Sequence, residues 1–160
     1  MFKFVRKPLI FMMIFTFSFT VFSTTMSQSA QAASSEWVGI SGDYKARFDS
    51  PHEPKTGKWH VHVYKGKKEI GSLNMDGSVH DKRKGGFSKV PKSIVKKLKG
   101  KSQWKKYEKK QKKVAEARKK VQGKPLWQIA LDPSAIFALV AALGMTIGKF
   151  TVWQWSKIFA

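Results

Sequence analysis

The sequence has no cysteine, and it has only 10 acidic residues against 31 basic ones. The absence of cysteine excludes a disulfide framework, a thiolate metal site and a cysteine nucleophile. Arginine is also scarce, since it supplies only four of the 31 basic residues. Lysine attracts phosphate as a hydrated point charge, whereas arginine grips it as a rigid fork. The formal net charge of +21 over 160 residues therefore indicates one small domain with appendages and non-specific attraction to a polyanion.

The excess positive charge is confined to the middle of the chain. Residues 33–81 hold seven basic and seven acidic residues, whereas residues 82–124 hold 19 basic residues and two acids. This stretch is predicted to bind an anionic membrane surface, a cell-wall polyanion or, non-specifically, nucleic acid. The lysines predicted to make these contacts are Lys96, Lys97, Lys105, Lys106, Lys109, Lys110, Lys112, Lys113, Lys119 and Lys120.

The N-terminus has the three parts of a secretory signal peptide. Three basic residues precede the uncharged stretch 9–22, which is short for a membrane-spanning helix. Ala30-Gln31-Ala32 then supplies a cleavage site of small residues. We expect residues 1–32 to be removed, which predicts a protein that is secreted or associated with a membrane from the extracellular side. An uncleaved N-terminal anchor is the alternative.

Residues 33–100 are predicted to form a small α+β domain. Candidate strands at 36–41 and 44–49 precede a strictly alternating run, residues 59–64, and a return strand at 69–75. Pro91 stands where a helix begins, and Gly100 stands where it ends. We expect an antiparallel β-meander of three or four strands with one packed helix.

Residues 101–124 are predicted to form a Lys-rich helix. Trp104, Tyr107, Val114 and Val121 recur at helical spacing, and most other positions are Lys, Gln or Glu. Because so narrow an apolar seam buries little surface, we expect this helix to be solvated or to dock on a partner.

Residues 125–160 are predicted to be a hydrophobic, membrane-directed tail. As a helix at ~1.5 Å per residue, the stretch 134–155 measures about 33 Å and would cross a hydrocarbon core of ~30 Å. The alternative is a buried core helix, but the preceding Lys-rich residues are expected to offer too little apolar surface to cover it. Gly144 and Gly148 form a GxxxG pair suited to helix–helix self-association. The residues predicted to insert are Ala135, Phe137, Leu139, Val140, Leu143, Gly144, Ile147, Gly148, Trp153 and Trp155.

The histidines offer a second possible site. His60 and His62 lie on the same face of a predicted strand, and His52 and His80 stand in neighbouring loops. Such a cluster can bind zinc or act as a general acid and base in RNA cleavage. His60, His62 and His80 are therefore the catalytic candidates. The alternative is a sheet face whose imidazoles hydrogen-bond or stack; because no spacing fixes a third ligand, we predict neither a metal site nor a cofactor.

Residues 60–98 resemble small β-sheet modules of bacterial toxin systems. The resemblance rests on the strand His60-Val61-His62-Val63, on Lys68-Glu69-Ile70-Gly71 and Asp76-Gly77, and on the run from Gly86 to Pro91 before a helix. It implies a β-meander with a helix, and ribonuclease chemistry through His60 or His62. The order of blocks is similar to that of cannibalism-toxin and bacteriocin precursors, whose toxic part is a hydrophobic C-terminal peptide.

These features predict an exported, cationic bacterial protein, most simply a bacteriocin-like toxin that acts at membranes and is paired with an immunity protein. One alternative is a secreted nuclease-type toxin in which His60 and His62 are catalytic and the lysines hold RNA or DNA. The other is a non-toxic, tail-anchored surface protein. The sequence favours a protein without enzymatic activity but leaves the question open.

Overall fold

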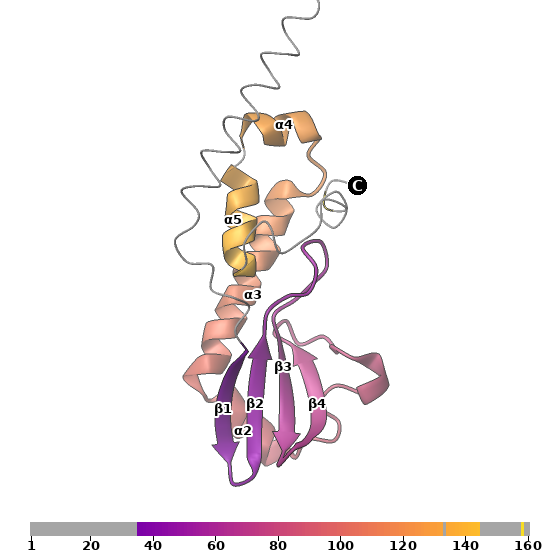
Figure 1. Ribbon diagram of the computed structural model, residues 1–160, viewed down its shortest axis with the longest axis vertical. Coiled ribbons are helices and arrows are strands. Elements are labelled where there is room, and N and C mark those ends of the chain that lie inside the picture. The colour runs from indigo at the N-terminus through magenta and orange to yellow at the C-terminus, as the bar shows by residue number, and fades with distance from the viewer. Residues whose placement is uncertain (1–34, 133, 145–157, 159–160) are drawn as a thin grey trace, which may run out of the picture. The chain divides into compact units, whose positions relative to one another are not determined.

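The computed structural model describes residues 35–132, 134–144 and 158 (Figure 1). The chain divides into two units, Met1–Gln31 and Ala32–Ala160, and the description concerns the second. The predicted signal peptide and its cleavage site lie outside the described residues. So do Ile147, Gly148, Trp153 and Trp155 of the set predicted to insert into a membrane.

Four antiparallel strands form one sheet in chain order, which confirms the predicted α+β meander. The strands are β1 (Glu36–Ser41), β2 (Tyr44–Asp49), β3 (His60–Lys65) and β4 (Lys68–Asn74). Tight turns join β1 to β2 and β3 to β4. Each turn contains a glycine with positive φ, 52° at Gly42 and 58° at Gly66, a conformation that other residues adopt at a cost.

Helices α2 (Lys92–Lys99) and α3 (Ser102–Val121) cover one face of this sheet (Figure 1). Because side chains alternate along a strand, every second residue points at these helices. Phe48 and Val61 are fully buried there. Tyr107 of α3 stacks on Phe48 with 4.7 Å between ring centroids. The opposite face of the sheet carries polar side chains together with the aromatic rings of Trp37 and Tyr64.

The prediction that the Lys-rich helix is solvated is wrong. Helix α3 runs past the sheet and packs against α5 (Ser134–Leu143) (Figure 1). Apart from the adjacent pair Ala117 and Arg118, its buried residues follow one another at intervals of three or four, so they form a continuous seam along the helix. They are Trp104, Tyr107, Gln111, Val114, Ala117, Arg118 and Val121.

The predicted transmembrane helix is also wrong. Helix α5 ends at Leu143, and Gly144 takes a left-handed φ of 67°. Within the described part of the chain, no helix combines the length and the apolarity needed to cross a membrane. Leu139, Val140 and Leu143 are buried, so they are core residues rather than membrane-inserting ones. The seam of α3 supplies the apolar surface that the sequence had seemed to lack.

Trp59, the residue before β3, connects the sheet to the C-terminal region. Its indole N–H donates to the carbonyl oxygen of Ala142 in α5 at 3.1 Å. A Cβ atom on Gly144 would lie 2.9 Å from the indole ring, so this glycine permits a close approach to Trp59. The remaining described elements are the short helices η1 (Lys82–Lys84) and α4 (Leu126–Leu131).

Candidate functional site

The face of the sheet turned away from α2 and α3 carries rows of polar side chains. Residues directly opposite each other in neighbouring strands point to the same face. One row, across β2, β3 and β4, is Asp49, His60 and Asn74; the next is Arg47, His62 and Ser72. The strand register therefore confirms the prediction that His60 and His62 lie on the same face of the sheet.

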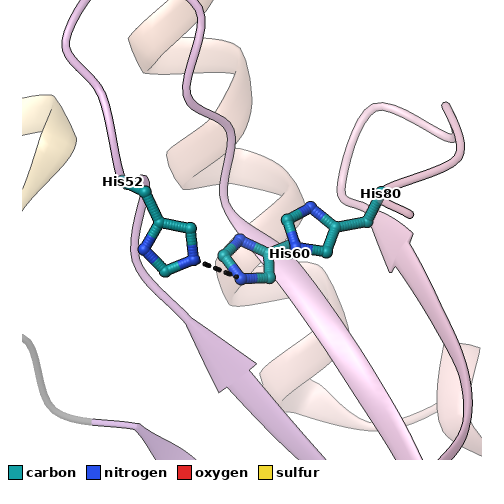
Figure 2. A group of neighbouring side chains, drawn as sticks. All are labelled: His52, His60 and His80. Carbon is teal, nitrogen blue, oxygen red and sulfur yellow. Dashed lines mark hydrogen bonds between the residues drawn. The ribbon is translucent and has the colours of Figure 1, made fainter. Parts of the chain in front are cut away.

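Two loops bring His52 and His80 to His60, as Figure 2 shows. His52 comes from the connection between β2 and β3, and its Nε2 lies 3.2 Å from Nε2 of His60. His80 follows β4, and its ring stacks on His60 with 3.8 Å between centroids and an interplanar angle of 11°. One nitrogen from each of the three rings lies within 4.8 Å of the other two.

Hydrogen bonds assign the proton positions on two of these rings. Nδ1 of His60 lies 2.9 Å from the carbonyl oxygen of Lys58, which can only accept, so Nδ1 carries the proton. Nδ1 of His80 lies 3.0 Å from Oδ1 of Asn74. The amide of Asn74 is oriented by its nitrogen, which donates to the carbonyl oxygen of Val79 at 3.2 Å. Neutral His60 and His80 therefore both carry their lone pair on Nε2.

His62 lies beside this group, but its ring nitrogens contact different groups. Its ring lies edge-on to His60 and His80. Nδ1 lies 3.0 Å from Oε1 of Glu69, and Nε2 lies 3.4 Å from Oδ2 of Asp49. Both nitrogens of His62 thus face carboxylates, whereas His52, His60 and His80 face one another.

Helix α3 holds the two segments that carry His52 and His60. The buried guanidinium of Arg118 donates to three carbonyl oxygens of the β2–β3 connection, those of Glu53, Pro54 and Gly57. Oε1 of Gln111 accepts the backbone N–H of Trp59 at 2.9 Å. These are the polar positions in the buried seam of α3, and they fix the backbone on either side of the cluster.

His52 and His80 border an open cavity of about 270 Å³, which Glu53, Thr56, Gly57, Lys58 and Asn74 also line. His60 lies beneath them with 1% of its surface exposed. Burial, together with the neighbouring imidazoles, lowers the pKa of His60 from 6.5 to about 4. Burial also lowers the pKa of His80. Both rings are therefore neutral at pH 7.

The lysines predicted to bind a polyanion lie on α2 and α3, away from the histidine cluster. Three of them have partners within the protein. Lys97 donates to Ser41 at 2.9 Å, and Lys106 pairs with Glu36 at 2.7 Å. Nζ of Lys110 lies over the ring of Trp59, 4.4 Å from its centroid. The others in the set are exposed.

Sequence reasoning missed the roles of His52, Asn74, Gln111 and Arg118. His52 did carry a signal, because it stands in a turn-rich stretch directly before the strand of His60. The three polar residues carried none, since their roles depend on contacts between distant parts of the chain.

Comparison with known proteins yields no match to this chain among protein-family models, curated proteins or solved structures.

Proposed function

We propose that this protein hydrolyses phosphodiester bonds of single-stranded nucleic acid at the cluster formed by His52, His60 and His80. The observation that carries the proposal is the convergence of these three imidazoles, from separate segments, beside an open cavity. Imidazole is the side chain most often used for proton transfer near neutral pH. The net charge of +21 supplies long-range attraction to a nucleic acid.

The cluster matches what hydrolysis requires. The oxygen of a water molecule bonds to phosphorus while the bond from phosphorus to one ester oxygen breaks. One proton leaves the attacking water, and the departing ester oxygen takes up a proton. Because His60 and His80 are neutral at pH 7, the cluster can remove the water proton directly or through a metal ion that acidifies the water.

The same face of the sheet supports the choice of a single-stranded substrate. Trp37 is 49% exposed, and its ring lies 5.1 Å from that of Tyr64. Lys45 Nζ and the Arg47 guanidinium lie 4.8 and 5.6 Å from the centroid of the Trp37 ring. Arg47 is also ion-paired at 2.8 Å with Asp49, which stands opposite His60 in the sheet. Aromatic rings and cations on a sheet are the groups on which unpaired bases stack and backbone phosphates bind.

The test is cleavage of labelled single-stranded and double-stranded RNA and DNA by the purified protein. We expect cleavage of single strands, and a loss of about 100-fold or more in rate in His52→Ala and in His80→Ala. Lys67→Ala, in the turn between β3 and β4, is the control and should cleave at the wild-type rate. Absence of cleavage, or cleavage that is unchanged in both histidine variants, would overturn the proposal.

The proposed binding surface around Trp37 and Tyr64 is tested separately, by the affinity of the protein for a single-stranded oligonucleotide. We expect Trp37→Ala to weaken binding of single strands by about 1–3 kcal/mol, the usual cost of removing one stacking ring. Equal affinity of the variant and the wild-type protein would remove Trp37 from the substrate path.

The membrane-acting toxin and the tail-anchored surface protein, for which we expected a spanning helix at 134–155, stay predictions; the described residues form no such helix. The nuclease reading does not depend on that helix. It is retained with a changed site: His60 and His80 stay candidates, and His52 takes the place that was predicted for His62. Export and an immunity partner stay predictions.

A further inference from the structure

We propose that His52, His60 and His80 bind one divalent transition-metal ion, for which zinc is the best fit. The role of this ion in activating water depends on the proposed hydrolysis. The existence of the binding site depends only on the geometry of the three rings.

The spacing of His52 and His60 is that of two ligands on one ion. Zinc binds histidine nitrogen at about 2.0–2.1 Å in a tetrahedral arrangement, which places two such nitrogens about 3.3 Å apart. The two Nε2 atoms lie 3.2 Å apart. Because Nε2 of His60 carries a lone pair, the metal-free contact requires a proton on Nε2 of His52. An ion would replace that proton without separating the rings.

The second nitrogen of His60 is already held as in metal sites, and that of His80 has a hydrogen-bond partner in the metal-free protein. A histidine that ligates a metal almost always donates its other N–H to a carbonyl or a carboxylate, which fixes the ring. His60 donates to the carbonyl oxygen of Lys58, and His80 donates to Oδ1 of Asn74. Ser78 and Val79 in turn accept from the Asn74 amide. His62 belongs to a second possible ligand group, with Asp49 and His60, but neither His62 nor Asp49 borders the cavity that His52 and His80 line.

His80 must turn for all three rings to bind one ion. The lone pairs of an imidazole lie in the ring plane, so two rings stacked at 11° cannot aim both lone pairs at one point. His80 borders the cavity of about 270 Å³, which leaves space for this rotation. Ion binding therefore breaks the stack between His60 and His80.

The donor set selects the class of ion. Three imidazoles without a carboxylate suit Zn²⁺, Cu²⁺ or Ni²⁺ and disfavour Mg²⁺ and Ca²⁺, which require oxygen ligands. Three protein ligands leave the fourth position of a tetrahedral ion open, as in zinc sites that activate water. Here that position would face the cavity.

The experiment uses purified protein that has been stripped with a chelator and titrated with Zn²⁺ by calorimetry and with Co²⁺ by visible absorption. We expect one equivalent of each to bind, with a tetrahedral Co²⁺ spectrum, and no heat with Mg²⁺. His52→Ala and His80→Ala should each weaken Zn²⁺ binding by more than about 100-fold, since removal of a ligand costs more than removal of a residue that only hydrogen-bonds to a ligand. The matched control His62→Gln should bind within about threefold of wild type.

The two proposals fail separately. Absence of Zn²⁺ binding, or binding lost in His62→Gln but kept in His52→Ala, overturns the metal site. Cleavage that survives the chelator overturns the proposed role of the metal ion in activating water, but it supports the proposed function. One-to-one Zn²⁺ binding without cleavage of any nucleic acid upholds the site and rejects the hydrolysis.

Discussion

Nε of Arg118 donates to the carbonyl oxygen of Pro54 at 2.7 Å, in the interior between α3 and the β2–β3 connection. Arg118 is 8% exposed, and its described charge-assisted bonds all go to backbone carbonyls of this connection. The lysine-rich helix thus uses one of the chain's four arginines to hold the loop of His52.

Replacement of this guanidinium should loosen the loop. We expect Arg118→Met to lower the free energy of unfolding by about 2–4 kcal/mol, because one buried and two partly buried hydrogen bonds to carbonyl oxygens lose their donor. The measurement is urea denaturation, with the exposed Lys119→Met as control. As a positioning residue, Arg118 should also affect Zn²⁺ affinity, which Arg118→Lys should partly restore. A free energy of unfolding within about 0.5 kcal/mol of wild type would show that these hydrogen bonds of Arg118 do not stabilise the protein.

Gly144 should resist substitution for two separable reasons. Gly144→Ala places a methyl group 2.9 Å from the Trp59 ring and also forces alanine to a φ of 67°. Gly123 has a similar φ of 75° with nothing within 4 Å, so Gly123→Ala measures the backbone cost alone, about 1 kcal/mol. We expect Gly144→Ala to cost clearly more and to shift the tryptophan fluorescence. Equal losses in thermal melting would mean that α5 does not dock at Trp59.

A pair of leucine variants tests whether α5 belongs to the core. Leu139 is fully buried, whereas Leu131 is 69% exposed. Leu139→Ala should lower the free energy of unfolding by about 2–5 kcal/mol, since it removes buried methyl groups and leaves a cavity. Leu131→Ala should change it little. The packing of α5 on α3 would be refuted if neither variant changed the unfolding curve.

Acid should destabilise the metal-free protein through His60. The pKa of His60 falls from 6.5 to about 4 on folding because the ring is buried beside His52, His62 and His80. Its contribution is therefore present above pH 6.5 and is lost as pH falls towards 4, a loss of about 3 kcal/mol in all. Unfolding free energies measured in a chelator between pH 7 and 4 should show this slope. His60→Gln should flatten it, and an unchanged slope would assign the acid sensitivity to other groups.

Local pattern was enough to predict the sheet and its packed helix. The alternation from Trp59 to Tyr64 and the turn residues on either side act over a few positions, and Pro91 marks the helix start in the same local way. It was also enough to place His60 and His62 on one face. It could not show that the two nitrogens of His62 contact the carboxylates of Glu69 and Asp49, because these contacts depend on strand register.

The two errors in the fold have one physical cause. Judged alone, the seam of α3 is too narrow to bury much surface. The apolar residues of α5, judged alone, have no apolar surface to cover them. In the structure they cover one another, together with Trp59, which lies far away in the sequence. The contacts that hold His52 and His80 against His60 could not be predicted for a related reason, since Arg118 and Asn74 make them across distances that no periodicity shows.

The long sequence separation of the α3 contacts has a consequence for synthesis. Gln111 and Arg118 follow their partners Trp59 and Pro54 by 52 and 64 residues. A nascent chain leaves the ribosome from its N-terminus, so all four histidines emerge before either of these residues does. The β-meander can pair its strands at that stage, but the loop of His52 has nothing to hold it. The site therefore assembles only after α3 has emerged, and a chain truncated before α3 would carry every histidine without forming the cluster.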